Sequence, residues 1–172
     1  MKTIPLNEAQ KLRKYAKKIE EELKVKVSVN KNEISVEGKA EDEFLAEKII
    51  DALSFGFPLK VALLIKSEEF LFEILNIKDY TTKKDMKTVR ARIIGREGKT
   101  LRTLANLSEC FFEIKENNVG IIGSPESIET AQNALISLIR GSKQANIYSY
   151  LEKHRVEPIL DLGLKKQTKT FK

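Results

Sequence analysis

Helical and strand-like spacings of apolar residues follow one another along the first third of the chain. Thr3 to Leu6 predicts a short extended piece, and Asn7 with Gln10 is typical of a helix start. The next apolar residues recur every three or four positions, as on one face of a helix. They are Leu12, Tyr15 or Ala16, Ile19 and Leu23. We therefore expect a helix that buries this stripe.

A hairpin and a second helix are predicted next. Apolar residues alternate with polar ones on both sides of a turn at residues 30–32, which is the period of a half-buried strand. They are Val25, Val27, Val29, Ile34 and Val36. The helix is expected from Glu41 to Phe55, with Gly56 as its C-terminal stop. Its predicted buried face consists of Leu45, Ile49, Ala52 and Leu53.

The second half of the chain repeats this order with additions. Pro58 begins a short apolar helix to about Lys66, which reads as a linker, and the aromatic and β-branched run from Phe70 to Ile77 predicts a strand. Further helices are expected from Thr82 and Asp85 to about Arg92, from Lys99 to Ser108, from Ser124 to Gly141 and from Gln144 to Arg155. A second hairpin is predicted by Phe112, Ile114, Val119, Ile121 and Ile122, and it ends at Gly123.

An internal repeat with a separation of 85 residues relates the two hairpins and the helices that follow them. Residues match in character at Val27 and Phe112, Val29 and Ile114, Asn32 and Asn117, Ile34 and Val119, Val36 and Ile121, Gly38 and Gly123, Leu53 and Leu138, and Gly56 and Gly141. The match fails before the hairpins, where the first copy lacks roughly a dozen or more residues. One helix–hairpin–helix unit is therefore expected twice, in unequal versions.

Charge distinguishes the two halves. The net charge is +6, yet residues 1–80 carry 14 basic and 15 acidic side chains, whereas residues 81–172 carry 17 and 10. Eight basic residues lie between Lys83 and Arg102, against two acidic ones. They are Lys83, Lys84, Lys87, Arg90, Arg92, Arg96, Lys99 and Arg102. This basic cluster falls where the first copy is shorter, and it favours an anionic ligand for the second copy.

A glycine-bracketed turn lies inside the basic cluster. Gly95 and Gly98 allow tight bending and close approach of a ligand to the backbone. The helix that follows begins with N–H groups that lack internal partners, and its dipole favours an anion there. Arg96, Lys99 and Arg102 add positive charge. The turn therefore predicts a site for the phosphates of a nucleic-acid backbone.

Catalysis and membrane insertion find little support in the residues. His154 is the only histidine and Cys110 the only cysteine, so neither a zinc cluster nor a histidine-based acid–base pair is expected. Cys110 is expected to be buried. No apolar run has the length of a membrane helix, and residues 1–9 have no signal-peptide core, so we expect a soluble cytoplasmic protein that needs no metal or cofactor.

The run from Ile93 to Leu104, followed by Phe112 and Ile114, resembles the core of a KH domain, whose pattern is two apolar residues, Gly-x-x-Gly and spaced apolar residues before a strand. The predicted order of elements is that of a eukaryotic-type KH module over about residues 69–141. The chain departs from the pattern at Glu109, where a glycine is usual.

The wider chain resembles archaeal relatives of the "partner of Nob" ribosome-assembly family over about residues 1–155. The segments Arg140–Ser142 and Tyr148–Lys153 carry this narrower resemblance. It implies an α+β fold of two tandem type I KH domains, each a small three-stranded sheet packed with helices, the first degenerate. The implied segments are a degenerate KH-like domain at 1–57, a linker helix at 58–68, a KH domain with a C-terminal helix at 69–155 and a basic, flexible tail at 156–172.

The resemblance also implies a ligand, partners and a site. Members of the family bind near the 3′ end of small-subunit ribosomal RNA precursors, beside the endonuclease Nob, and archaeal members are linked to the alpha subunit of initiation factor two. KH domains hold about four single-stranded nucleotides, with the loop on the backbone and an apolar groove for the bases. The implied loop is Gly95, Arg96, Glu97 and Gly98; the phosphate partners are Lys99 and Arg102; the groove residues are Ile94, Leu101 and Ile114; Arg90 and Arg92 are further contacts.

Alternatives remain open for several of these features. The turn can be an ordinary link between helices, Glu97 places a negative charge beside a phosphate, and the helix up to Arg92 can present a solvated face instead of RNA contacts. Tyr148 and Tyr150 are interpreted as packing residues. At the level of function, an RNA-binding assembly factor competes with a protein-interaction adaptor for which RNA contact is secondary, and intrinsic ribonuclease activity is a weaker third hypothesis.

Overall fold

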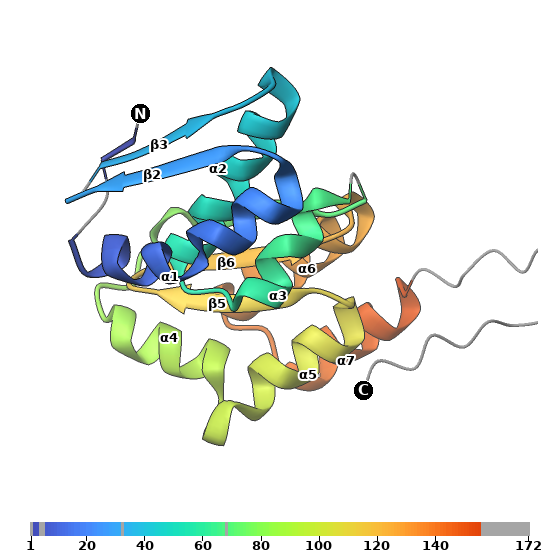
Figure 1. Cartoon of the computed structure of the whole chain (residues 1–172). Helices are drawn as coiled ribbons and strands as arrows, with labels where there is room; N and C mark the ends of the chain where they lie inside the picture. Colours follow the sequence, from blue (N-terminus) through green and yellow to red (C-terminus); the bar gives the residue numbers. More distant parts are fainter. Residues whose placement is uncertain (1, 4–5, 32, 68, 156–172) are drawn as a thin grey trace, which may run out of the picture.

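Two three-stranded antiparallel sheets, each packed with helices, organise the chain (Figure 1). The computed structural model describes residues 2–3, 6–31, 33–67 and 69–155. The predicted tail at 156–172, and the parts of the predicted extended piece and first turn at residues 4–5 and 32, lie outside the described residues. Among the described helices, none is both long and apolar enough to cross a bilayer.

The first unit is built from β1 (Lys2–Thr3), α1 (Leu6–Leu23), β2 (Lys26–Asn30), β3 (Glu33–Glu37) and α2 (Ala40–Phe55). Its strands lie in the order β1-β3-β2, with Val27 opposite Val36 and Val29 opposite Ile34. These side chains pack on the core that α1 and α2 supply. The predicted helices and hairpin are confirmed, although α1 begins at Leu6, inside the predicted extended piece.

A short helical segment joins this unit to the next. It consists of α3 (Leu59–Ala62) and the 3-10 turn η1 (Leu63–Lys66), as the apolar pattern predicted. Ala62 and Ile65 are buried in the first core. This segment therefore packs against the first unit, and its role as a linker remains a prediction.

The second unit has the same sheet order, β4-β6-β5. Its elements are β4 (Leu71–Asn76), η2 (Ile77–Tyr80), α4 (Met86–Ile94), η3 (Arg96–Gly98), α5 (Lys99–Ser108), β5 (Phe111–Lys115), β6 (Asn118–Gly123), α6 (Pro125–Arg140) and α7 (Gln144–Lys153). The Ser124 side chain caps α6 and Pro125 begins it, as predicted. The start of α4 differs from the prediction: Asp85, not Thr82, caps this helix by accepting a hydrogen bond from the Thr88 N–H.

The repeat is visible residue by residue. A shift of 85 positions superimposes the bounds of β2 on those of β5 and the bounds of α2 on those of α6. The first strands of the two units are separated by a smaller shift. Thr3 of β1 pairs with Glu33, and Asn76 of β4 pairs with Asn118, so the first strands are 73 positions apart. The first unit therefore lacks 12 residues before its hairpin. In that interval α1 runs as one helix, where the second unit has α4, the glycine turn and α5.

The two units meet through an aromatic cluster on the second sheet. Phe55 and Phe57 of the first unit and Phe72 of β4 lie with ring centroids 5.7 to 6.1 Å apart. The first core also takes in Ile122 of β6. The opposite face of this sheet carries the second core, which includes Val119 and Ile121. Figure 1 accordingly shows a stack of first sheet, first helices, second sheet and second helices.

Gly120 is required where the aromatic rings meet β6. A Cβ built at this glycine would lie 2.7 Å from the Phe55 ring and 2.8 Å from the Phe57 ring. Both distances are shorter than side-chain contacts allow. The absence of a side chain at this single position therefore lets the first unit lie directly on the second sheet.

The backbone at Glu109 shows how the chain departs from the KH pattern at this position. It ends α5 with φ 57° and ψ 30°, the left-handed conformation that glycine adopts without cost. A glutamate in this conformation costs about 1–2 kcal/mol. The chain thus keeps the backbone that the pattern requires, although the residue differs.

We expect Gly120→Ala to destabilise the protein by about 1–3 kcal/mol, because the new methyl group overpacks against two rings. At a strand position with free space, the same substitution would stabilise the protein, since alanine is favoured over glycine by roughly 0.5–1 kcal/mol. Urea unfolding measures the free-energy change. The same substitution should cost less in a Phe55→Ala background, where one ring is gone, and an equal cost in both backgrounds would contradict the proposed contact.

Candidate nucleic-acid interface

The turn between α4 and α5 is formed by three residues with positive φ. Gly95 has φ 75° and ψ 176°, Glu97 has φ 53° and Gly98 has φ 73°. The Gly98 N–H donates to the Gly95 carbonyl at 3.2 Å. After these residues α5 begins at Lys99. The Lys99 N–H donates to the Arg96 carbonyl, and the turn with the start of α5 lies at a corner of the molecule (Figure 1).

The two glycines are required for different reasons. The conformation of Gly95 belongs to a region that only glycine occupies readily. A Cβ at Gly95 would also overlap the Thr100 hydroxyl and lie 2.6 Å from the Thr100 Cβ. At Gly98 a Cβ would meet no atom within 4 Å, so only the positive φ favours glycine there. Gly95 therefore packs the turn against α5, and Gly98 leaves open space for a ligand.

Positive side chains gather on one side of the turn. An open groove of about 520 Å³ is lined by Arg96, Glu97, Lys99, Arg102, Thr103 and Asn106. Arg102 Nη2 donates to the Glu97 carbonyl at 2.6 Å, so this arginine also fixes the turn. The side chains of Arg96, Glu97 and Lys99 are exposed. Three cations surround one carboxylate here, and the groove favours an anion.

Apolar side chains lie on the elements around the turn. Ile94, the last residue of α4, is 37% exposed although it is a large hydrophobic residue. Leu101 on α5 and Ile114 on β5 are half-buried against the second core. The predicted groove residues therefore combine one exposed side chain with two that help to form the core.

Arg90 and Arg92 make contacts that the sequence did not predict. Arg90 Nη1 donates to the Glu116 carbonyl at 3.1 Å and to Asn117 Oδ1 at 2.9 Å, which ties α4 to the turn between β5 and β6. Arg92 Nη2 donates to the carbonyls of Gly141 and Ser142 at 2.8 and 2.7 Å. Both guanidinium groups hold the protein together. Their predicted role as RNA contacts remains a prediction.

Sequence reasoning missed two polar residues beside the turn. Thr100, the second residue of α5, is 3% exposed, and its hydroxyl accepts a hydrogen bond from Gln144 Nε2 at 2.9 Å. No spacing rule connects residues 44 positions apart. The available signal was a polar residue on the apolar side of α5, which at a buried position requires a partner.

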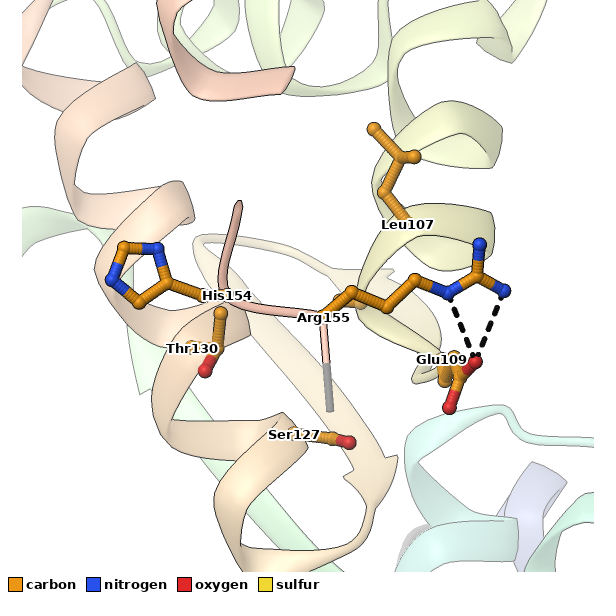
Figure 2. Close-up of a pocket in the computed structure, with 7 residues that line it drawn as sticks. Leu107, Glu109, Ser127, Thr130, His154 and Arg155 are labelled. Carbon is orange, nitrogen blue, oxygen red and sulfur yellow. Dashed lines mark hydrogen bonds and ion pairs between the residues drawn. The ribbon is translucent and has the colours of Figure 1, made fainter. Parts of the chain in front are cut away.

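The pocket at the far end of α5 shows no catalytic arrangement (Figure 2). Arg155 donates to Glu109 Oε1 from Nε at 3.3 Å and from Nη2 at 3.2 Å, while His154 stacks on Tyr150 with ring centroids 4.2 Å apart. Burial raises the pKa of the Cys110 thiol to about 11, so this predicted buried cysteine stays protonated near neutral pH. Among the described residues, no group of three His, Cys, Asp or Glu gathers to hold a metal.

The predicted packing role of two tyrosines is confirmed. Tyr148 and Tyr150 of α7 are half-buried against the second core, beside the buried Ile147 and Leu151. The helix α7 therefore adds to the core of the second unit.

Comparison with known proteins identifies the second unit. A family model of the second KH domain of PNO1, described as a eukaryotic-type KH domain (KH-domain type I), matches residues 71–156, half of the chain. The chain belongs to the PNO1/Dim2 family of KH-domain proteins. The predicted family, and the predicted α+β fold with a type I KH domain, are confirmed.

Three matches describe the likeness across this family. A KH domain-containing protein of Methanocaldococcus jannaschii is 32% identical over 146 residues, which cover 81% of this chain and 64% of the relative. The pre-rRNA-processing protein PNO1 of Yarrowia lipolytica is 30% identical and is covered to 55% of its length. A chain of the a/eIF2alpha–aDim2p–rRNA complex from Pyrococcus horikoshii superimposes with a TM-score of 0.79 at 28% identity, covering 90% of this PNO1/Dim2 chain and 92% of that one. The chain thus spans between half and two-thirds of the two curated relatives.

The two glycines of the turn should differ in their tolerance of a side chain. We expect Gly95→Ala to destabilise the protein by about 3 kcal/mol or more, since strain and overlap with Thr100 add. Gly98→Ala should cost about 1–2 kcal/mol, from the left-handed conformation alone. Chemical denaturation of the two variants measures the difference. Equal losses would show that Thr100 does not pack against Gly95.

Proposed function

We propose that the second unit binds single-stranded RNA through the turn at Gly95–Gly98. This proposal rests on the turn itself, whose two glycines begin α5 beside an open groove lined by three basic side chains. The KH type I family of the second unit supports it, because KH domains bind single strands in this way. Residues 1–57 are proposed as a degenerate KH-like domain, 58–68 as a linker and 69–155 as the binding domain.

The residues around the turn have different proposed roles in RNA binding. Arg96 and Lys99 are placed to neutralise phosphates, while the first N–H groups of α5 and the glycine backbone approach them closely. Arg102 orders the turn through the Glu97 carbonyl and adds charge to the groove. Ile94 offers its exposed side chain to a base, and Ile114 of β5, half-buried against the second core, is the second apolar residue proposed for the groove. The basic residues set affinity and salt dependence, and the apolar residues set sequence preference.

We further propose that the RNA is the 3′ region of small-subunit ribosomal RNA or its precursor. The names of the relatives support this assignment: one is a pre-rRNA-processing protein, and the Pyrococcus complex contains rRNA. In this proposal the protein works in the cytoplasm and presents the RNA to a separate endonuclease, the Nob enzyme, without cleaving it. The protonated thiol of Cys110 and the stacked ring of His154 are consistent with binding rather than catalysis.

A second candidate function is that of an adaptor for translation initiation or ribosome assembly. The complex of a/eIF2alpha, aDim2p and rRNA supports it, because a protein and an RNA are held together there. The first unit favours the same role: it has no glycine turn, and residues 1–80 have a net charge of −1. In this proposal the alpha subunit of initiation factor two is a partner, and the RNA contact is secondary.

Replacing Arg96 and Glu97 by two aspartates should abolish binding of a short single-stranded rRNA fragment while the fold persists. The turn then carries two negative charges where phosphates bind. Fluorescence anisotropy measures the affinity, and circular dichroism checks the fold. The control variant, Arg13→Asp with Glu47→Asp, makes the same change in charge at exposed positions of α1 and α2.

Loss of affinity in the turn variant alone supports the proposed site. Unchanged affinity in that variant contradicts it, and equal loss in both variants would show that only the net charge matters. Incubation of labelled RNA with pure protein and Mg²⁺ tests the separate point about catalysis, since cleavage would contradict the assignment of this chain as a binding factor.

A further inference from the structure

Residues 141–144, which run from the end of α6 into the first residue of α7, contact both helices that flank the Gly95–Gly98 turn. On the α4 side, Arg92 lies three residues before Gly95 and donates to the carbonyls of Gly141 and Ser142 at 2.8 and 2.7 Å. Gly141 caps the C-terminus of α6, where the helix dipole favours a cation. The arginine therefore fixes the last turn of α4 to the end of α6.

On the α5 side, the contact is made by Gln144, the first residue of α7. Its Nε2 donates to Thr100 Oγ1 at 2.9 Å. Thr100 in turn lies against the backbone of Gly95, since a Cβ built there would lie 2.8 Å from the Thr100 nitrogen. Gln144, Thr100 and Gly95 therefore form one continuous line of contact from α7 to the turn.

The helix that carries Gln144 is anchored in the second core. Ile147 and Leu151 of α7 are 3% and 0% exposed and belong to the second core, and the Gly141 N–H donates to the Leu138 carbonyl at 3.2 Å. Residues 141–144 are thus held between two packed helices. Contacts made from this segment can determine the position of the turn, instead of following it.

We propose that Arg92, Thr100 and Gln144 are positioning residues for RNA binding, which hold the Gly95–Gly98 turn from residues 141–144. In this role each residue acts through the turn and needs no contact of its own with the RNA. The proposal rests on the proposed function, because it assigns a structural support to that same site. It gives α7, which lies beyond the hairpin and α6 of the unit, a role in the affinity of the RNA site.

The test compares variants of the full chain in binding the same short single-stranded rRNA fragment. Gln144→Ala and Thr100→Val remove the two partners of one hydrogen bond, Thr100→Ser keeps the hydroxyl, and Asn146→Ala is a control at an exposed position on α7. We expect the first two variants to bind about threefold to tenfold more weakly, and the other two to bind within about twofold of the parent chain.

Two further readouts separate positioning from phosphate contact and from loss of folding. The slope of log affinity against log salt should stay unchanged in Gln144→Ala, whereas Lys99→Ala should reduce it by about one. In protein without RNA, the amide NMR signals of Gly95 and Gly98 should shift in Gln144→Ala but not in Asn146→Ala. These signals report the geometry of the turn whether or not RNA binds.

The outcomes distinguish the two proposals. If the parent chain binds RNA and Lys99→Ala weakens it, but Gln144→Ala and Thr100→Val bind normally, the positioning role is wrong and the RNA site stands. If the glycine signals shift while no variant, Lys99→Ala included, changes RNA affinity, the contacts from residues 141–144 do position the turn and the proposed RNA site is wrong. Thr100→Ser keeps the hydroxyl, so if this variant bound RNA as weakly as Thr100→Val, the proposed role of the hydroxyl would also be wrong.

Discussion

The contact of two phenylalanine rings with a glycine in a β-strand determines how this molecule is assembled. Phe55 and Phe57 lie on β6 at Gly120, where any side chain would separate the two units. The second sheet consequently has apolar contacts on both faces, with the first unit on one side and α4, α5 and α6 on the other. An isolated copy of the second unit would expose this aromatic face to water.

This arrangement separates packing from binding. The first unit occupies the face of the sheet that is remote from α4 and α5, so the glycine turn stays at an exposed corner (Figure 1). The first unit itself lacks the 12 residues that form this corner in its sibling. Its proposed part in RNA binding is therefore indirect: it stabilises the sheet on which the helices of the second unit rest.

Local patterns predicted most of the fold, because most helices and strands show their own spacing of apolar residues and their own capping or turn residues. The bounds of α5, Lys99–Ser108, were predicted as the structure has them. The cap of α6 was predicted from Ser124 followed by Pro125. Contacts between distant segments did not follow, since no local rule relates Arg92 to Gly141 or Thr100 to Gln144. The loop residues of the candidate site were visible in the sequence, whereas the residues that support the loop required the structure.

Crosslinking of the protein to RNA in a cell extract, with both the crosslinked peptide and the RNA position identified, is the most direct test of RNA binding at the Gly95–Gly98 turn. We expect the crosslinked peptide to contain residues from Ile94 to Arg102, and the RNA to be single-stranded sequence near the 3′ end of small-subunit ribosomal RNA. Crosslinks confined to the first unit, or to other classes of RNA, would contradict it.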